Sequence, residues 1–193
     1  ASSTGKALTG AGKSLSKTVT TPIVAMGTAA IKASLDFEST FTSVRKTVDA
    51  TEAEFDALAA SSKAMSTQIA ASTGEINEVM ATAGQLGIHK NYLADFSRTM
   101  IDLGNSTDIV ANEAASTLAK FANITNMDQS LFGNLGATLV DLGNKFATTE
   151  SSIMEMSLRL AAAGHQVGLS EAQILGFAAA LSSVGIEAEM GGS

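Results

Sequence analysis

The chain of 193 residues has no cysteine, no tryptophan, one tyrosine and a single proline. The absence of thiols excludes disulfides, thiolate metal ligands and a cysteine nucleophile. Because proline is the strongest helix breaker, its near absence leaves the 17 glycines as the main signals for helix ends. Aromatic residues make up only 5%, so the 45% of apolar residues are mostly Ala, Leu, Ile, Val and Met. These side chains favour an α-helical protein with closely packed helices.

Long hydrophobic runs are also missing. The longest run, Ile174 to Leu181, is far shorter than the roughly 20 residues that a helix needs to cross a bilayer. No secretory signal is evident in the first residues. Since the sequence starts at Ala1 and stops at Ser193, we expect an excerpt of a longer chain.

Acidic residues are absent before Asp36, where four lysines give the first 35 residues a charge of +4. From Asp36 onward there are 8 basic and 19 acidic residues, which gives −11. An acidic surface repels phosphate, so specific nucleic-acid binding is not expected of this part. The basic leader is interpreted as a solubilising, flexible arm.

The sequence divides into three predicted segments. Residues 1–20 are rich in Ser, Thr, Gly and Lys and are expected to form a flexible basic arm. Thr21-Pro22 has the pattern of a helix start, and a long helix is predicted over residues 21–50. It carries an apolar stripe with heptad-like spacing, suited to packing on a partner helix and to self-association. The stripe consists of Phe37, Phe41, Val44 and Val48.

Residues 51–193 are predicted to form a helical-hairpin domain, because start signals and glycines alternate about every 15–20 residues. Capping boxes are predicted at Thr51–Glu54, Ser72–Glu75 and Ser170–Gln173, and further helix starts at Thr107-Asp108 and Thr148-Thr149-Glu150. The turn is placed at Asn123 to Asp128, and helix ends are placed at Gly84, Gly87, Gly104, Gly143, Gly164, Gly168 and Gly185.

One short motif occurs twice in this domain. Asp102-Leu103-Gly104-Asn105 recurs as Asp141-Leu142-Gly143-Asn144, each time after an apolar helix. The period of about 40 residues with two helices is typical of helical-hairpin solenoids. The predicted fold is therefore all-α: a long N-terminal helix followed by an array of antiparallel helical hairpins, either solenoid-like or an irregular bundle.

No catalytic, cofactor-binding or metal-binding residue is predicted. Gly10-Ala11-Gly12-Lys13-Ser14 resembles a phosphate loop, but it lacks the first glycine of that motif and a preceding strand. His89 and His165 have no partner at metal-ligand spacing. The carboxylate pairs Glu75/Glu78 and Glu187/Glu189 are interpreted as helix caps and solvated side chains. We therefore expect no cofactor and no enzymatic activity.

Several motifs resemble, in order and spacing, the conserved region of tape measure proteins of long-tailed phages, over roughly residues 5–193. The family often has a proline near Ser72, which is missing here. The matching stretches are Phe37–Phe41 with Val44-Arg45, Ala83–Ile88, both Asp-Leu-Gly-Asn copies, Phe121–Thr125, Gly164–Ala172 and Leu181–Glu189.

The resemblance implies a structural protein that occupies the tail lumen, helps to set tail length, is made in the host cytoplasm and leaves during DNA ejection. The implied partners are tail-tube proteins, tail-tip proteins and tail assembly chaperones, together with membrane contact of the parent chain during ejection. Since glycines and caps interrupt the helices, we interpret this segment as a compact docking module and not as the ruler itself. The alternative is a generic intracellular helical-repeat interaction scaffold; a membrane-active helical protein is a third interpretation.

Overall fold

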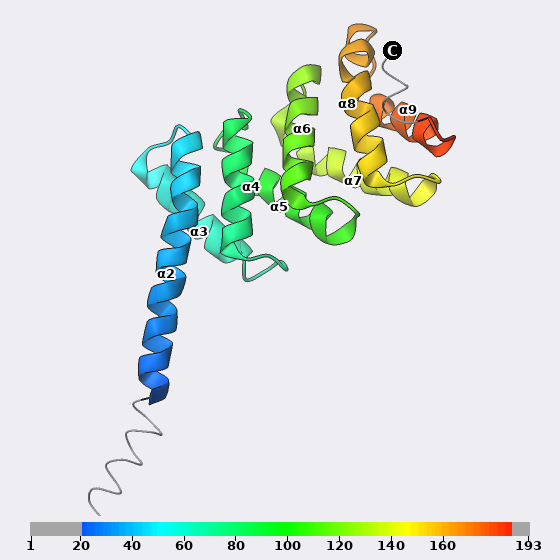
Figure 1. The fold of residues 1–193 in the computed structure, drawn as a ribbon. Helices are drawn as coiled ribbons and strands as arrows, with labels where there is room; N and C mark the ends of the chain where they lie inside the picture. Colours follow the sequence, from blue (N-terminus) through cyan, green and yellow to red (C-terminus); the bar gives the residue numbers. More distant parts are fainter. Residues whose placement is uncertain (1–20, 187–193) are drawn as a thin grey trace, which may run out of the picture. The chain divides into compact units, whose positions relative to one another are not determined.

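The computed structural model in Figure 1 describes residues 21–186, with side chains from residue 34 onward. The predicted basic arm, its Lys13 motif and the Glu187/Glu189 pair lie outside this range. Within residues 21–186 the structure is all-α, as predicted, with eight α-helices, one short 3-10 helix and no strand. The elements are α2 (Thr21–Thr47), α3 (Glu52–Met65), α4 (Thr73–Gln85), α5 (Leu93–Ser106), α6 (Ala111–Thr125), η2 (Gln129–Leu131), α7 (Phe132–Lys145), α8 (Glu150–Gln166) and α9 (Glu171–Ser183).

The chain forms two compact units, residues 1–39 and residues 40–193, and the boundary falls inside α2. The second unit contains the last two turns of α2 and all helices from α3 to α9. We call this unit the solenoid, because of the way its helices pack.

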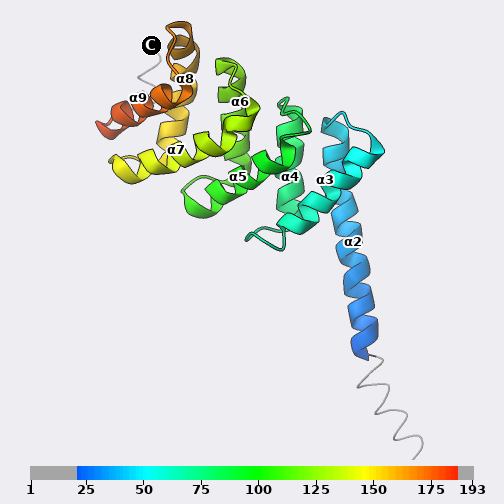
Figure 2. The ribbon, with the colours of Figure 1, turned by 180° about the vertical axis from the view of Figure 1, so that it is seen from behind.

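The solenoid has two layers of helices. Helices α4, α6 and α8 lie side by side in one layer, and α3, α5, α7 and α9 form the other, as both views show (Figures 1 and 2). Within a layer each helix packs on the next one, and most consecutive helices also pack on each other. Contacts between elements one and two places apart along the chain are the mark of a solenoid, so the array is solenoid-like.

The helices recur with a fixed period. Helices α5, α7 and α9 begin at residues 93, 132 and 171, and α6 and α8 begin at residues 111 and 150. Successive starts within each layer are thus 39 residues apart. The repeated Asp-Leu-Gly-Asn motif falls at the ends of α5 and α7, which confirms the predicted two-helix unit of about 40 residues.

The glycines of that motif do not end their helices, and here the prediction was wrong. Gly104 and Gly143 lie inside α5 and α7, which continue to Ser106 and Lys145. A Cβ atom on Gly104 would lie 3.0 Å from both the backbone nitrogen and the Cβ of Ala111. This glycine therefore lets the first turn of the next helix come close. Gly84 and Gly164 also lie within helices, α4 and α8.

Helix ends are formed as the local sequence predicts at most other places. All three predicted capping boxes are present, at Thr51, Ser72 and Ser170. Thr149 caps α8 by accepting a hydrogen bond from the Ser152 amide. The glycines that follow α4, α8 and α9 have the positive φ of helix C-caps, at Gly87, Gly168 and Gly185.

Two predictions about α6 were wrong. Thr107-Asp108 does not start the helix, which begins at Ala111 after Val110 without a side-chain cap. The predicted turn at 123–128 is shorter, since α6 runs to Thr125 and ends on Asn126 in the left-handed conformation, φ 52°. Asparagine tolerates this conformation better than other non-glycine residues, so it replaces the expected glycine.

The apolar stripe of α2 lies inside the chain. Phe41 and Val44 are buried in the solenoid, and Phe41 meets the ring of Phe55 on α3 edge-on, with centroids 6.4 Å apart. Arg45 covers the Phe55 ring at 4.7 Å. Phe37 is also buried. The stripe thus offers little exposed surface for the self-association that the sequence suggested.

A buried polar chain joins α2, α3 and α4. The Ser62 hydroxyl donates to Oδ1 of Asn77 at 2.7 Å, and Nδ2 of Asn77 donates to the Thr40 hydroxyl at 2.9 Å. Ser62 and Asn77 are fully buried. Because buried polar groups are costly unless they are paired, this chain fixes how the first helices of the solenoid meet.

Candidate functional site

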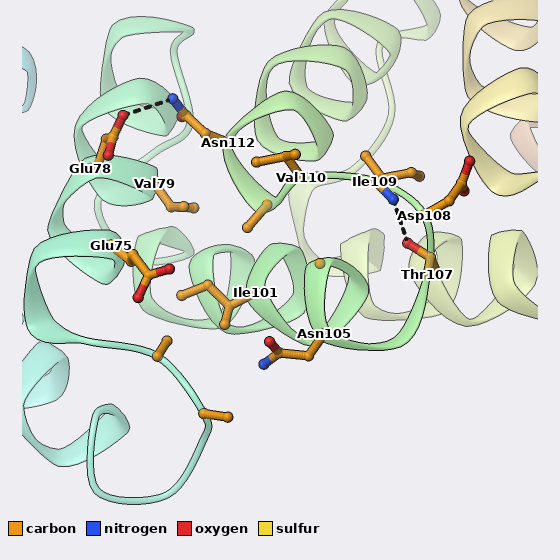
Figure 3. Close-up of a pocket in the computed structure, with 14 residues that line it drawn as sticks. Glu75, Glu78, Val79, Ile101, Asn105, Thr107, Asp108, Ile109, Val110 and Asn112 are labelled. Atoms are coloured by element: carbon orange, nitrogen blue, oxygen red, sulfur yellow. Dashed lines mark hydrogen bonds between the residues drawn. The ribbon is translucent and has the colours of Figure 1, made fainter.

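The largest feature with both polar and apolar walls is an open groove of about 550 Å³ between α4 and α6. We call it the α4–α6 groove (Figure 3). Its walls come from α4, from the end of α5, from the link 107–110 and from the first residues of α6. The floor is apolar, with Val79, Ile101 and Ile109 buried beneath it.

Carboxylates and amides line the edge of the groove. Glu78 on α4 faces Asn112 on α6, whose Nδ2 donates to the carboxylate at 3.2 Å (Figure 3). The Asn112 side chain is itself held by Thr82, which donates to its Oδ1 at 2.6 Å. Glu75 and Asp108 complete the acidic lining.

Two of these carboxylates are held in the ionised form. The backbone N–H of Ser72, followed by its hydroxyl, lowers the pKa of Glu75 below its ordinary value. Burial raises the pKa of Asp108, but hydrogen bonds from the hydroxyl and the amide of Ser151 outweigh it, so the pKa is lowered. Both side chains therefore stay negative at neutral and mildly acidic pH.

One large apolar side chain stands out in this acidic setting. Val110 lines the groove and is 67% exposed. Valine usually lies inside a folded protein. An apolar floor, an exposed valine and an anionic edge together suit a segment that carries both aliphatic and basic side chains.

A second open groove, of about 640 Å³, lies between the last turns of α2 and α4 within the solenoid. Its lining is mostly small and hydroxyl-bearing, including Thr40, Ser43 and Thr47, and it shares Glu78 with the α4–α6 groove. Lys46 adds one positive charge. Because Glu78 borders both grooves, it is the natural centre of this surface.

Residues that the sequence singled out for chemistry do not meet. His89 lies in the link after α4 with its ring near Tyr92, whereas His165 lies in the last turn of α8 and not in a link, as had been expected. Glu75 caps α4, as predicted. Within the described part of the chain no group of three His, Cys, Asp or Glu side chains could hold a metal ion.

Sequence reasoning missed the groove. Its polar residues come from three helices and a link, and they form no motif along the chain. Asn105, at the end of the first Asp-Leu-Gly-Asn copy, is the one lining residue in a pattern that the sequence had marked. A motif that marks the end of a repeat unit is thus also a marker for the groove between neighbouring units.

Membrane spans were also sought. Among the described residues, none of the helices combines the length and the apolar character needed to cross a bilayer.

Comparison with protein families gives one informative result. Residues 59–193 match the family described as phage-related minor tail protein. No curated protein matches the chain, and no solved structure does. The matched segment covers more than half of the sequence and most of the solenoid. Family membership favours a structural role over an enzymatic one, and the chain belongs to the phage-related minor tail proteins, which are components of the virion tail.

Proposed function

We propose that this chain is the compact docking segment of a tape measure protein. The family supports a structural role in a phage tail, and the motifs quoted above resemble tape measure proteins more specifically. In this proposal the parent chain helps to set tail length, is assembled in the host cytoplasm with tail chaperones, lies in the tail lumen and is released during DNA ejection. Its contact with a membrane would come at that last step.

The observation that carries the docking role is the solenoid itself. Residues 52–183 fold into seven α-helices of 13 to 17 residues each, stacked in two layers. A continuous helix gains about 1.5 Å per residue, whereas a folded stack gains much less length per residue. Such a segment is poorly suited to measure length but well suited to present a surface.

The α4–α6 groove is the proposed docking surface. Its occupant would be a segment of a tail-tip or tail-tube protein with basic and aliphatic side chains. Charge complementarity supports this choice, because Glu75, Glu78 and Asp108 surround the exposed Val110. Complementary charge mainly raises the association rate and the specificity of such an interface.

The docking role is tested by reversing one charge in the groove. Glu78→Lys in the phage gene is expected to reduce the yield of complete tails by at least about tenfold, as counted by electron microscopy. The matched control is Glu155→Lys, since Glu155 is an exposed carboxylate on α8 outside the groove. Equal yields for the two variants would contradict the proposal, provided that circular dichroism shows both to be folded.

The ruler role of the parent protein has a separate test. An in-frame deletion of about 60 residues of continuous helix outside this segment is expected to shorten tails by about 90 Å, at 1.5 Å per residue. Tails of unchanged length would contradict the tape measure proposal and favour the general interaction scaffold.

A further inference from the structure

The last hairpin of the solenoid carries an apolar face that we call the α8–α9 end face. A hollow of about 220 Å³ lies there between the end of α8 and α9. Val167 is 76% exposed and Phe177 is 54% exposed at this hollow. Leu160, Leu169 and Ile174 also line it. Exposed apolar patches of this kind mark interaction sites.

The repeat shows what kind of surface this face is. Helix α6 packs on α4 and on α8, whereas α8 packs within its own layer on α6. Leu160 is half-buried, but Phe121, which lies 39 residues earlier on α6, is 2% exposed. In the preceding repeat the corresponding position is thus covered by further structure. The α8–α9 end face is shaped to receive helices of the same kind as those of the solenoid.

Charge narrows the choice of occupant. From Leu160 through Ile186 the one formally charged side chain is Glu171. The chain from Asp36 onward otherwise has an excess of 11 negative charges, so two copies repel each other over most of this surface. The α8–α9 end face is where a second copy can approach with little repulsion.

The opposite end of the solenoid offers no matching apolar face. There Phe41 and Val44 of α2 are buried, and Phe55 of α3 is covered by Phe41 and Arg45. A head-to-tail stack of copies would therefore find an apolar face on one side only. A symmetric contact uses the same patch on both copies and does not have this difficulty.

We propose that two copies of this chain associate through their α8–α9 end faces, related by a two-fold axis. In this dimer Phe177 of each copy packs into the hollow beside Val167 of the other. The interface is small and nearly uncharged, so its affinity depends on protein concentration and little on salt. This inference goes beyond the docking role and does not depend on it, because the two surfaces share no residue.

Sedimentation velocity of the 193-residue chain at about 1 to 100 µM, a range that brackets weak association, tests this dimer. The expected result is a reversible shift from monomer to dimer as concentration rises. Val167→Glu and Phe177→Glu each place a charge in the apolar contact and are expected to weaken the association constant by at least about tenfold.

The matched control is Val110→Glu, because Val110 is similarly exposed but lies in the α4–α6 groove. This variant is expected to dimerise like the unaltered chain. All three positions are exposed, so circular dichroism should show unchanged helix content. A chain that stays monomeric at 100 µM, or a Val110→Glu variant that dissociates as fully as the other two, would overturn the proposal.

Discussion

Asp108, in the link before α6, accepts two hydrogen bonds from Ser151 in the first turn of α8, which lies 43 residues later. The Ser151 amide donates at 3.2 Å and its hydroxyl at 2.5 Å. The carboxylate therefore caps the N-terminus of a helix in the next repeat, where negative charge is also favoured by the helix dipole. This contact ties one repeat to the next at the edge of the α4–α6 groove.

Asp108→Ala is expected to lower the free energy of unfolding by about 1 kcal/mol, the usual cost of losing a helix cap. Urea denaturation followed by circular dichroism measures this change. Asp56→Ala, at an exposed site on α3, is the control and is expected to change stability by less than about 0.5 kcal/mol. Equal losses at the two sites would show that Asp108 does not act as a cap.

The glycines of the solenoid should respond differently to alanine. Gly104→Ala is expected to destabilise by about 1 to 2 kcal/mol, because its Cβ would press on the backbone of Ala111. Gly176→Ala, in α9 with no atom within 4 Å of the new Cβ, should stabilise by about 0.5 to 1 kcal/mol through helix propensity. Thermal melting distinguishes the two signs, and a stabilising Gly104→Ala would refute the close-approach role.

The buried chain of Ser62, Asn77 and Thr40 allows a test of coupling. Asn77→Ala is expected to cost about 2 kcal/mol, since it leaves the buried Ser62 hydroxyl without its acceptor. The double variant Ser62→Ala/Asn77→Ala should cost less than the sum of the single variants by about 1 kcal/mol, measured in a double-mutant cycle. Additive losses would mean that the two side chains do not stabilise each other.

The capping box at Thr51 predicts a pH dependence. The Thr51 amide, followed by Lys90, lowers the pKa of Glu54 from 4.5 to about 2. A lowered pKa in the folded state means that the charge stabilises the protein above about pH 4.5, and that this stability is lost as the pH falls toward 2.

Glu54→Gln retains the acceptor of the capping box, as Gln173 does in the box at Ser170, but removes the charge. The stability difference between the variant and the unaltered chain should be constant above about pH 5 and should shrink between pH 4.5 and 2. Urea denaturation over this pH range measures it. A difference that does not change with pH would contradict the assignment to Glu54.

Local signals in the sequence predicted the helices where one turn contains all of the interacting atoms. The boxes at Thr51, Ser72 and Ser170 are of this kind, because both partners lie three residues apart. Thr107-Asp108 looked like another helix start, but Asp108 serves a helix 43 residues away. Composition and spacing along the chain do not contain that information.

The glycines and the groove show the same limit. Gly104 and Gly87 look alike in sequence, yet one permits close packing and the other a left-handed turn. The difference depends on where Ala111 lies in three dimensions. The groove joins Glu78, Asp108 and Val110 from separate elements, so it became visible only once the 39-residue stacking of the helices was known.

The most direct test of the central claim, that this segment docks and does not measure length, is tail length after duplication of residues 111–149 in the phage gene. These residues form one repeat of 39 residues, and solenoids accept an additional repeat without refolding of the others. If the segment is a folded docking module, electron microscopy should show tails of unchanged length. Tails longer by about 58 Å, the rise of 39 residues in a continuous helix, would show that the segment is part of the ruler and would contradict the docking role.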